Sequence, residues 1–591
     1  MTRARVIVGI GLAALFFAAA KGSSHLSLTP DQLRVFQLIL YWAGAQLLIV
    51  FAAGDPIGRW ALKAMERLDA WILRDRGRAA FLLALAILTY TIFWSVYTFA
   101  RHYYFHSDRD LGNQVQAVWN TAQGRPFFRS MEVNNDLGDH VRPYLALLSL
   151  PYLIFPSPYV LLFFQSSVLA LSAWPLYRLA QRKFNSPLLA LTVASCVLAY
   201  PPLGFLNRAD FHCEVIAVPL LIAAYERIDV EDFNKAGIFM GLALLAKENI
   251  GLSVAALGLV AAFYHKRWRF GLTWMVVGMA YSLAALFVVI PAFRGAPSDT
   301  LARYRWLGDT PLEMLWTTVS HPALWLKHLI AADRFVTLAQ LLAPLAFVPL
   351  LSLPTLTPAM PALIYNFVST WPIQQTIYYH YMGPVIPFVG IAAVMGFHRL
   401  ITYARAGKVF DSIAPGKLRS DQVTALAASI MLLATLASWT YENPIAGAGK
   451  IAVTSEFAER ISQKGRWART SSSMPMIQPN DSAIREGLKH VPAEIYVLTT
   501  DNYVPHLSHR ARIGTITRAP VSSLMPEVGA IFVNLRDLRS RGCDDYLQNL
   551  RVAASLGFGE AFYRDGVLVL QRGKGDVRRL KELLGNWPGC D

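Results

Sequence analysis

The sequence predicts an α-helical polytopic membrane protein of about 11 to 13 transmembrane helices, followed by a small C-terminal α/β domain. Of its 591 residues, 54% are hydrophobic and only 16% are charged, and the mean hydropathy is +0.36. The stretches 79–100 and 422–440 carry no charged residue, and each has about the 20 residues that a helix needs to cross a bilayer core. Beyond residue 441, short strand-like and helix-like runs alternate, which predicts the separate domain.

Residues 1–60 are expected to form a transmembrane hairpin. The first 22 residues contain Arg3, Arg5 and an apolar run, a pattern typical of either a cleaved signal peptide or a first anchor helix. A second apolar run at 33–53 follows at once and favours the anchor. Either choice leaves the orientation of the later helices unchanged.

Residues 61–441 are expected to form the main transmembrane domain. Prolines and short loops divide its apolar runs, and the run at 144–156 is short enough to be re-entrant or interfacial. The apolar runs of the whole chain lie at about 6–20, 33–53, 79–100, 144–156, 158–178, 187–205, 213–225, 236–246, 250–264, 270–293, 336–353, 357–369, 381–398 and 421–440.

The distribution of positive charge predicts which loops face outward. With the N-terminus in the cytoplasm, the inner loops hold about 21 Lys and Arg in about 76 residues, against about 13 in about 121 in the outer loops, as the positive-inside rule requires. Loops 54–78 and 399–420 carry most of this signal. The segments expected on the outer face are 101–143, 206–214, 294–335, 370–380 and everything after 441.

The net charge of +16 is expected to reflect contact with anionic lipid headgroups. No basic run interleaved with aromatic residues predicts nucleic-acid binding. We therefore expect membrane lipids, and not nucleic acid, as partners, and a multi-pass membrane protein.

The segment 442–591 is expected to be an extracytoplasmic α/β domain. Residues 443–480 are rich in Pro, Gly and Ser, which predicts a linker with irregular structure. Beyond it, strands are predicted at 494–499, 529–534 and 567–571, and helices at 481–490 and 543–556.

The first long outer loop, 101–143, is dense in polar residues. Leu111, Val115 and Val118 recur at helical spacing with Asn and Gln on the other face, so we expect an amphipathic helix in the membrane interface with Trp119 at headgroup depth. Asp108 and Asp110 come just before it. A carboxylate there suits a general base for a sugar hydroxyl, or a ligand of a divalent cation. The alternative is that Asp110 caps the helix and Asp108 is solvated.

Other ionisable residues lie at predicted outer ends of spans, and we expect them to share one outward cavity. The alternatives are buried ion pairs, side chains that extend to the interface, and, at His380 in the run Tyr378 to Tyr381, an aromatic belt. The arginines expected to clamp a lipid phosphate, or to contact headgroups, are Arg101, Arg109, Arg125, Arg142, Arg208, Arg303, Arg305 and Arg334. The full candidate binding set is His140, Arg142, Arg125, His212, Glu214, Lys247, Glu248 and His380.

Several of these residues belong to a pattern that resembles a bacterial family of predicted membrane proteins, domain of unknown function 2079. The matching residues, spread over roughly 80–560, are Asp110-Leu111-Gly112, Gln116, Trp119-Asn120, Gly124-Arg125-Pro126-Phe127, Gly138, His140, Pro143, Pro151-Tyr152, Pro156-Ser157-Pro158, Gln165, Pro175-Leu176-Tyr177-Arg178, Phe211-His212, Glu214, Lys247-Glu248 and His506-Leu507-Ser508-His509-Arg510.

The family looks like the GT-C glycosyltransferases, which use polyprenyl-phosphate sugars and carry a catalytic acid in the first outer loop. The resemblance therefore implies a GT-C-like fold, a lipid-linked sugar donor and Asp110 as that acid, with Asp108 as its substitute. The hairpin 1–60 departs from that pattern, since the GT-C fold usually begins with the span before the loop.

Three functions are consistent with the sequence. The first is transfer of a sugar from a polyprenyl-phosphate donor to an acceptor of the cell envelope. The second is a transporter or flippase of a lipid-linked or small polar substrate, which predicts charges near span midpoints and two related halves. The third is a non-catalytic envelope assembly protein. The charges gather at predicted outer ends and no related halves are visible, which favours the first.

Overall fold

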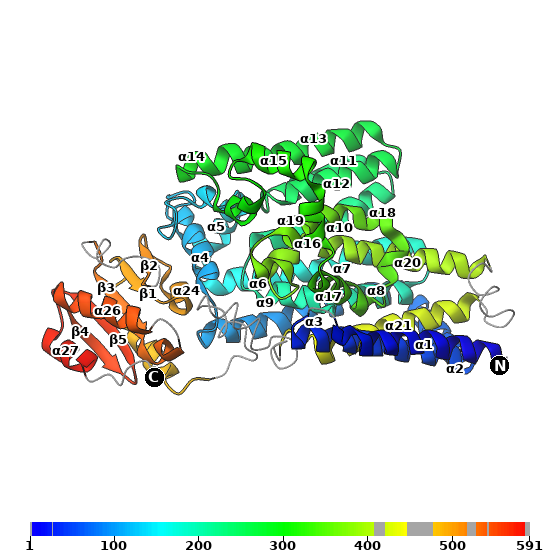
Figure 1. The fold of residues 1–591 in the computed structure, drawn as a ribbon, viewed down its shortest axis with the longest axis horizontal. Helices are drawn as coiled ribbons and strands as arrows, with labels where there is room; N and C mark the ends of the chain where they lie inside the picture. Colours follow the sequence, from blue (N-terminus) through cyan, green and yellow to red (C-terminus); the bar gives the residue numbers. More distant parts are fainter. Residues whose placement is uncertain are drawn as a thin grey trace.

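The computed structural model describes residues 3–25, 28–406, 420–445, 477–516, 527–540 and 543–585. It consists of a long helical body and a small sheet domain at one end of the long axis (Figure 1). The N-terminus lies at the opposite end of the body. The prediction of a helical membrane protein with a C-terminal α/β domain is confirmed, whereas the boundaries at 60 and 441 stay predictions.

The N-terminal hairpin is formed by α1 (Arg3–Gly22) and α2 (Pro30–Leu73), which pack together. Thr29 caps α2, which runs for 44 residues, or about 66 Å, more than twice the thickness of a bilayer core. The expectation of a loop over 54–78 is therefore wrong as far as Leu73. Residues 57–73 are mostly good helix formers, so the helix continues through Pro56.

Fewer helices than expected are long and apolar enough to span a membrane. Among the described residues there are six, or seven if one pair bent by 43° counts as a span, compared with the 11 to 13 predicted. Several predicted runs form helices of 10–17 residues instead, or break at prolines. A helix satisfies its backbone hydrogen bonds within itself, so such short helices need no full crossing. The six are Gly77–Tyr103, Pro158–Phe184, Trp268–Arg294, Val348–Val368, Ile386–Arg405 and Ser420–Trp439, and the bent pair is Pro187–Leu198 with Pro201–Arg208.

The remaining body is helical throughout. Its α-helices are α3 (Arg76–Tyr103), α4 (Arg109–Ala122), α5 (Tyr144–Ile154), α6 (Pro158–Leu171), α7 (Ala173–Phe184), α8 (Pro187–Leu198), α9 (Pro201–Arg208), α10 (Ala217–Asp229), α11 (Phe233–Leu244), α12 (Ile250–Phe263), α13 (Trp268–Ala284), α14 (Ile290–Arg294), α15 (Pro311–Ser320), α16 (Pro322–Leu329), α17 (Ala332–Leu342), α18 (Leu353–Leu356), α19 (Met360–Val368), α20 (Ile386–Arg405) and α21 (Ser420–Tyr441).

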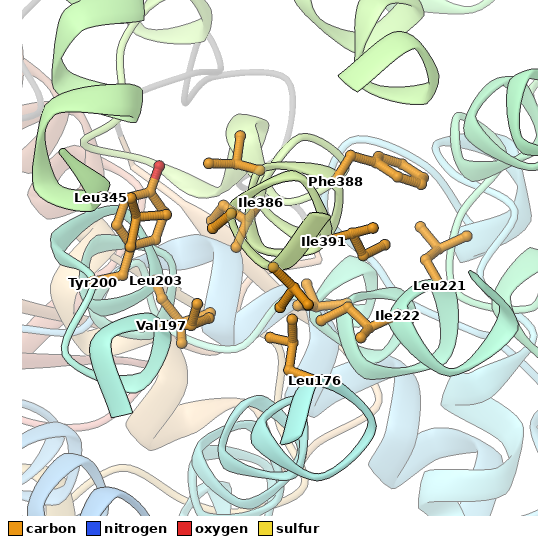
Figure 2. Close-up of a cluster of buried hydrophobic side chains, with 14 of the residues drawn as sticks. Leu176, Val197, Tyr200, Leu203, Leu221, Ile222, Leu345, Ile386, Phe388 and Ile391 are labelled. Carbon is orange, nitrogen blue, oxygen red and sulfur yellow. The ribbon is translucent and has the colours of Figure 1, made fainter. Parts of the chain in front are cut away.

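The core of the body lies where α7, α8, α10 and α20 meet. Leu176, Val197, Leu221 and Ile391 are all buried there and interdigitate (Figure 2). At the side of the body, α12 and α13 approach so closely that a Cβ on Gly251 would lie 2.4 Å from a backbone oxygen of α13. Small residues at such contacts let helices pack where lipid supplies no hydrophobic drive.

The C-terminal domain is a five-stranded mixed sheet in the order β2-β1-β3-β5-β4. Strand β1 pairs in parallel with β2 and β3, while β5 pairs antiparallel with β3 and β4. The strands are β1 (Val497–Thr499), β2 (Ile513–Thr515), β3 (Ala530–Asn534), β4 (Phe558–Arg564) and β5 (Val567–Arg572), and the helices are α23 (Asp481–Lys489), α24 (Val504–Leu507), α26 (Cys543–Ser555) and α27 (Val577–Gly585).

The three predicted strands and two predicted helices of this domain are confirmed as β1, β3, β5, α23 and α26. Strands β2 and β4 were not predicted. Strand β2 has only three residues, and β4 has an irregular register with a partly buried face, so neither gives a clear alternating pattern.

The C-terminal domain docks on α4 and the end of α3 through the segment 503–513. A Cβ on Gly112 would lie 2.3 Å from a methyl carbon of Val504, so only glycine allows this approach. The Gln116 amide donates to the carbonyls of Arg510 and Ala511 at 3.2 and 3.0 Å. Ser130 bonds the backbone of Ile513 on β2, at 2.7 and 2.8 Å.

Two histidines of this segment are buried in the docked interface. His506 stacks on His102 of α3 with ring centroids 4.1 Å apart, and His509 Nε2 lies 2.9 Å from the Tyr152 hydroxyl. Burial lowers the pKa of His506 to about 3, and burial together with Arg510 lowers the pKa of His509 to about 4. The docked state therefore favours neutral rings.

We expect low pH to weaken docking of the C-terminal domain. As the pH falls, the rings of His506 and His509 bind protons at a higher pH in the undocked state than in the docked state. The free energy that stabilises docking has its full value above about pH 6.5 and decreases as the pH drops towards 4. At pH 5 it is smaller by of order 2 kcal/mol per ring. Spin labels at the exposed positions 123 and 489 should show one distance at pH 7.5 and a broad, longer distribution at pH 4.5. His506→Phe should flatten this dependence, and the exposed control His490→Gln should not; equal distances at both pH values would contradict the expectation.

Candidate functional site

A cavity of about 790 Å³ opens beside α4, at the end of the body that carries the C-terminal domain. Its walls come from α4, the loop 129–142, the break between α11 and α12, the turn 299–307 and the segment 371–381. These segments lie far apart in the sequence. The candidate residues that line the cavity are Asp110, His140, Arg142, His212, Lys247, Glu248 and His380, and those that do not are Asp108, Arg125 and Glu214.

Helix α4 presents three different faces. Asp110, Asn113 and Gln114 line the cavity. Leu111, Val115 and Val118 pack against α5 and α6, and Gly112 with Gln116 faces the C-terminal domain. Nine of its 14 residues are buried by protein, so α4 packs within the protein, while its expected place at the depth of the membrane interface stays a prediction.

The exposed Arg125 takes no part in the cavity. Its guanidinium lies 5.2 Å from the centroid of Trp119, which in turn stacks near His509 of the C-terminal domain. Trp119 is half-buried at this contact, so it packs against the docking segment.

Asp108 and Asp110 have different roles. Asp108 is the helix cap, since its side chain accepts a hydrogen bond from the Asp110 backbone N–H at 2.9 Å, so the suggestion that Asp110 is the cap is wrong. Removal from water raises the pKa of Asp108 well above its usual value, and the nearby Asp110 and Asp210 carboxylates add to this. Asp110 is the carboxylate that faces the cavity, with one oxygen 4.0 Å from His212 Nε2.

His212 and His380 form a stacked pair in the cavity wall, with ring centroids 3.7 Å apart. Behind them, Glu214 is almost fully buried and bonds Lys247 Nζ at 2.9 Å. Glu214 therefore supports the cavity through Lys247 and does not face it. His380 and the adjacent Tyr381 line the cavity, so they lie in a cavity wall and not in an aromatic belt on the outside of the protein.

Glu248 fixes the orientation of His140. One carboxylate oxygen lies 2.7 Å from His140 Nδ1, and the other accepts the Val141 N–H at 3.0 Å. The Ser282 hydroxyl donates to the Glu248 carbonyl and holds the backbone. Burial would raise the pKa of Glu248, but His140 and Lys247 outweigh it and lower the value to about 2.

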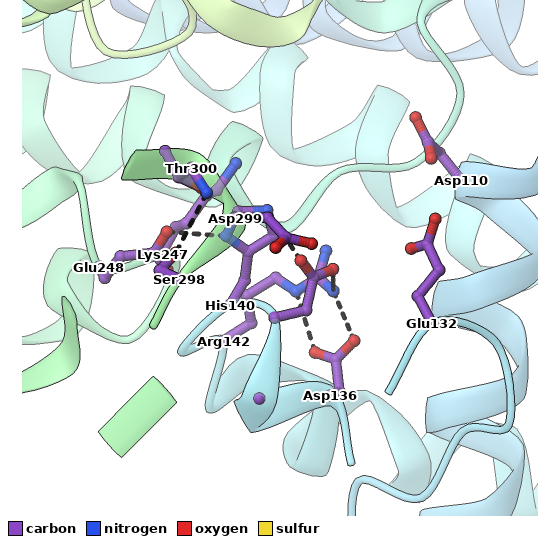
Figure 3. A network of polar contacts seen from close by, with 12 residues as sticks. Asp110, Glu132, Asp136, His140, Arg142, Lys247, Glu248, Ser298, Asp299 and Thr300 are labelled. Atoms are coloured by element: carbon purple, nitrogen blue, oxygen red, sulfur yellow. Dashed lines mark hydrogen bonds and ion pairs between the residues drawn. The ribbon is translucent and has the colours of Figure 1, made fainter. Parts of the chain in front are cut away.

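A network of arginines and aspartates forms the floor beneath His140 (Figure 3). Arg142 bonds both oxygens of Asp136, at 3.0 and 2.5 Å, and Arg129 bonds Asp139 at 2.7 Å. Burial opposes ionisation of Asp139, yet His140 and the two arginines hold its pKa far below the usual range. Arg142 is thus neutralised locally and is poorly suited to hold a ligand's phosphate.

Arg303 differs from the other described Arg and Lys side chains of the cavity in having aromatic rings and an amide as partners in place of a carboxylate. Its guanidinium lies 6.0 Å from the Trp371 ring and 5.7 Å from the Tyr381 ring, and it donates to Gln374 at 3.0 Å. Within the described part of the chain, no carboxylate forms an ion pair with it. The cations that are paired with carboxylates are Arg109, Arg129, Arg142, Lys247 and Arg294.

From the sequence, Arg303 is one of eight candidate arginines, and of the aromatic residues of this wall only Tyr381 stands out, as part of a predicted aromatic belt. Tyr304, Tyr365, Trp371 and Tyr381 all line the cavity. Loop aromatics carry no periodic signal, so only the folded arrangement identifies them. Among the residues the structure describes, no group of three or more His, Cys, Asp or Glu side chains is placed to hold a metal ion.

A cavity wall that holds Asp110, Arg303, imidazoles and aromatic faces suits an anionic ligand that also carries hydroxyl groups. The guanidinium recognises phosphate or carboxylate oxygens, and the Asp110 carboxylate accepts from a hydroxyl.

Comparisons with known proteins give one family and eleven matching chains of solved structures, among them two crystal structures of ArnT. A family model described as "Predicted membrane protein (DUF2079)" matches residues 101–569. No curated protein matches. ArnT from Cupriavidus metallidurans bound to undecaprenyl phosphate is 12% identical, with 84% of this chain and 98% of that chain covered and a TM-score of 0.45. The apo form of ArnT from Cupriavidus metallidurans is 13% identical, with 84% of this chain and 98% of that chain covered and a TM-score of 0.40. At these scores the likeness carries no functional argument.

We expect Lys247→Met to destabilise the protein, because it leaves the buried Glu214 carboxylate without its cation. Removing one partner of a buried pair typically costs about 3–5 kcal/mol. The thermal unfolding midpoint in detergent should fall clearly for Lys247→Met and recover much of the loss in the double variant Lys247→Met/Glu214→Met. The exposed control Lys327→Met should unfold like the wild type. A stable single variant would show that the pair does not hold this wall.

Proposed function

Because the chain belongs to the DUF2079 family of predicted membrane proteins, whose model matches residues 101–569, we propose that it is a GT-C-type integral membrane glycosyltransferase. It transfers a sugar from a polyprenyl-phosphate donor to an acceptor of the cell envelope. The protein is a multi-pass membrane protein, and in this proposal it lies in a bacterial inner membrane with its C-terminal domain outside.

One observation carries the proposal: Asp110 and Arg303 line the same cavity. Arg303 is placed to hold the donor's phosphate, since its charge is not neutralised by a described carboxylate. Asp110 is placed to take the proton of the acceptor hydroxyl as that oxygen attacks the anomeric carbon. A single displacement of this kind inverts the anomeric configuration.

The apolar side of the cavity supports a lipid-linked donor. Leu286 lines the cavity and belongs to the π-helical segment Ala285–Val289, where the next residues, Phe287 and Val288, are exposed on the outside of the body. In a membrane such exposed residues contact lipid, so a polyprenyl chain can lie against them while its phosphate enters the cavity.

The transporter alternative is less well supported. The ionisable residues of the cavity come from loops and helix ends, such as the start of α4 and the break between α11 and α12. Transporter sites are expected near span midpoints.

Asp110→Asn should abolish transfer while leaving the fold intact. General base catalysis contributes typically about 10²–10⁴-fold, so the loss should be of that size. Purified protein in proteoliposomes, given a panel of polyprenyl-phosphate hexoses and pentoses, is assayed for released polyprenyl phosphate. The exposed control Asp309→Asn should keep the wild-type rate. Full activity of Asp110→Asn would end its assignment as the base.

Arg303→Met should weaken binding of undecaprenyl phosphate about tenfold or more, because it removes a charge-assisted bond. Arg305→Met is the matched control, an exposed arginine of the same turn that does not line the cavity. Native mass spectrometry of both variants measures the affinity. Equal affinities would place the phosphate elsewhere.

A further inference from the structure

His140 and Glu248 form a dyad that the proposed role of Asp110 does not use. The Glu248 carboxylate lies 2.7 Å from Nδ1 of the imidazole, and its other oxygen is held by the Val141 N–H at 3.0 Å. Both residues line the cavity, and the side chains are about 20% and 11% exposed. Such a pairing of an imidazole with an orienting carboxylate is the arrangement used for acid–base catalysis.

The carboxylate determines which ring nitrogen faces the substrate. An ionised carboxylate only accepts hydrogen bonds, so Nδ1 carries the proton donated to Glu248. The other nitrogen, Nε2, is then the atom available to the cavity. The Asp139 carboxylate lies near Nε2, but its Oδ1 is 3.9 Å away, which is beyond hydrogen-bond distance.

The dyad and Asp110 lie apart in the cavity. Asp110 projects from the first turn of α4, whereas His140 and Glu248 lie on the other side of the cluster (Figure 3). A displacement at a sugar carbon has two ends, the attacking hydroxyl and the departing phosphate. Two separated proton-transfer groups match these two ends.

We propose that His140, positioned by Glu248, is a general acid that protonates the departing phosphate, an inference that rests on the proposed function. The acceptor's O–H proton goes to the Asp110 carboxylate while its oxygen bonds the anomeric carbon. The bond from that carbon to the phosphate oxygen breaks, and its electron pair stays on that oxygen, which takes a proton from His140 Nε2–H. The products are the glycosylated acceptor and the protonated polyprenyl phosphate.

Several charged or titratable groups surround His140. They are Asp139 and Arg142 from its own loop, Lys247 and Glu248, His380, and Arg294 with Asp299 from the turn after α14. Glu248 is the group in direct contact, so its removal is the sharpest probe.

The test measures the rate of polyprenyl phosphate release by the full-length protein in proteoliposomes as a function of pH. The wild type should lose activity at alkaline pH as the acid loses its proton. His140→Gln should lose about 10²–10⁴-fold at the optimum and should lack this alkaline limb. The loss should be much smaller with a polyprenyl-diphosphate sugar, because the diphosphate departs without protonation.

Glu248→Gln distinguishes positioning from mere support of the fold. It keeps the hydrogen bond but removes the negative charge, so the alkaline limb should persist and move to lower pH. His321→Gln, an exposed histidine outside the cavity, is the control and should match the wild type.

The outcomes separate the two proposals. If the wild type releases polyprenyl phosphate but His140→Gln keeps its rate and its alkaline limb, the general-acid inference is overturned and the proposed function stands. An equal loss with the monophosphate and diphosphate donors also overturns it. If the wild type releases no polyprenyl phosphate from any donor, both proposals fail together.

Discussion

The packing of two faces of helix α4 against the rest of the protein is the constraint on which the cavity depends. A helix of 14 residues is marginally stable alone, so its position is set by what packs against it. The apolar face of α4 packs against α5 and α6. On the face with Gly112 and Gln116, Gly112 contacts Val504 and the Gln116 amide donates hydrogen bonds to the C-terminal domain. The third face of α4 therefore faces the cavity, and this orientation directs the Asp110 side chain into it.

Charge balance inside the body explains why one arginine stands out. Ions at membrane depth are costly unless paired, and the described cations around the cavity follow that rule with acidic partners. Arg303 satisfies its guanidinium with ring faces and one amide, which shield it without cancelling its charge. A site that must accept an anion needs such an exception.

The sequence predicted the class of fold and much of the candidate site, for a physical reason. Hydropathy and positive charge report directly on lipid and on loop position, and ionisable residues are rare enough in apolar chains that Asp110, His140, Lys247 and Glu248 stand out. Fewer of the described helices than predicted are long and apolar enough to span a membrane, because hydropathy does not reveal where an apolar run is divided into short helices. The burial of α4 and the aromatic wall around Trp371 depend on contacts between distant segments, which local patterns do not carry.

The docking of residues 503–513 on α4 has a consequence for how the molecule is made. The bond from Gln116 to Arg510 joins residues 394 positions apart, so about two thirds of the 591-residue chain lies between them. During synthesis, α4 is made long before the segment 503–513. Until that segment exists, the face of α4 that carries Gly112 and Gln116 has no packing partner there. Helix α4 is thus fully packed only once residues 503–513 have been made, so a chain truncated before residue 503 lacks one of the two contacts that orient the helix bearing Asp110.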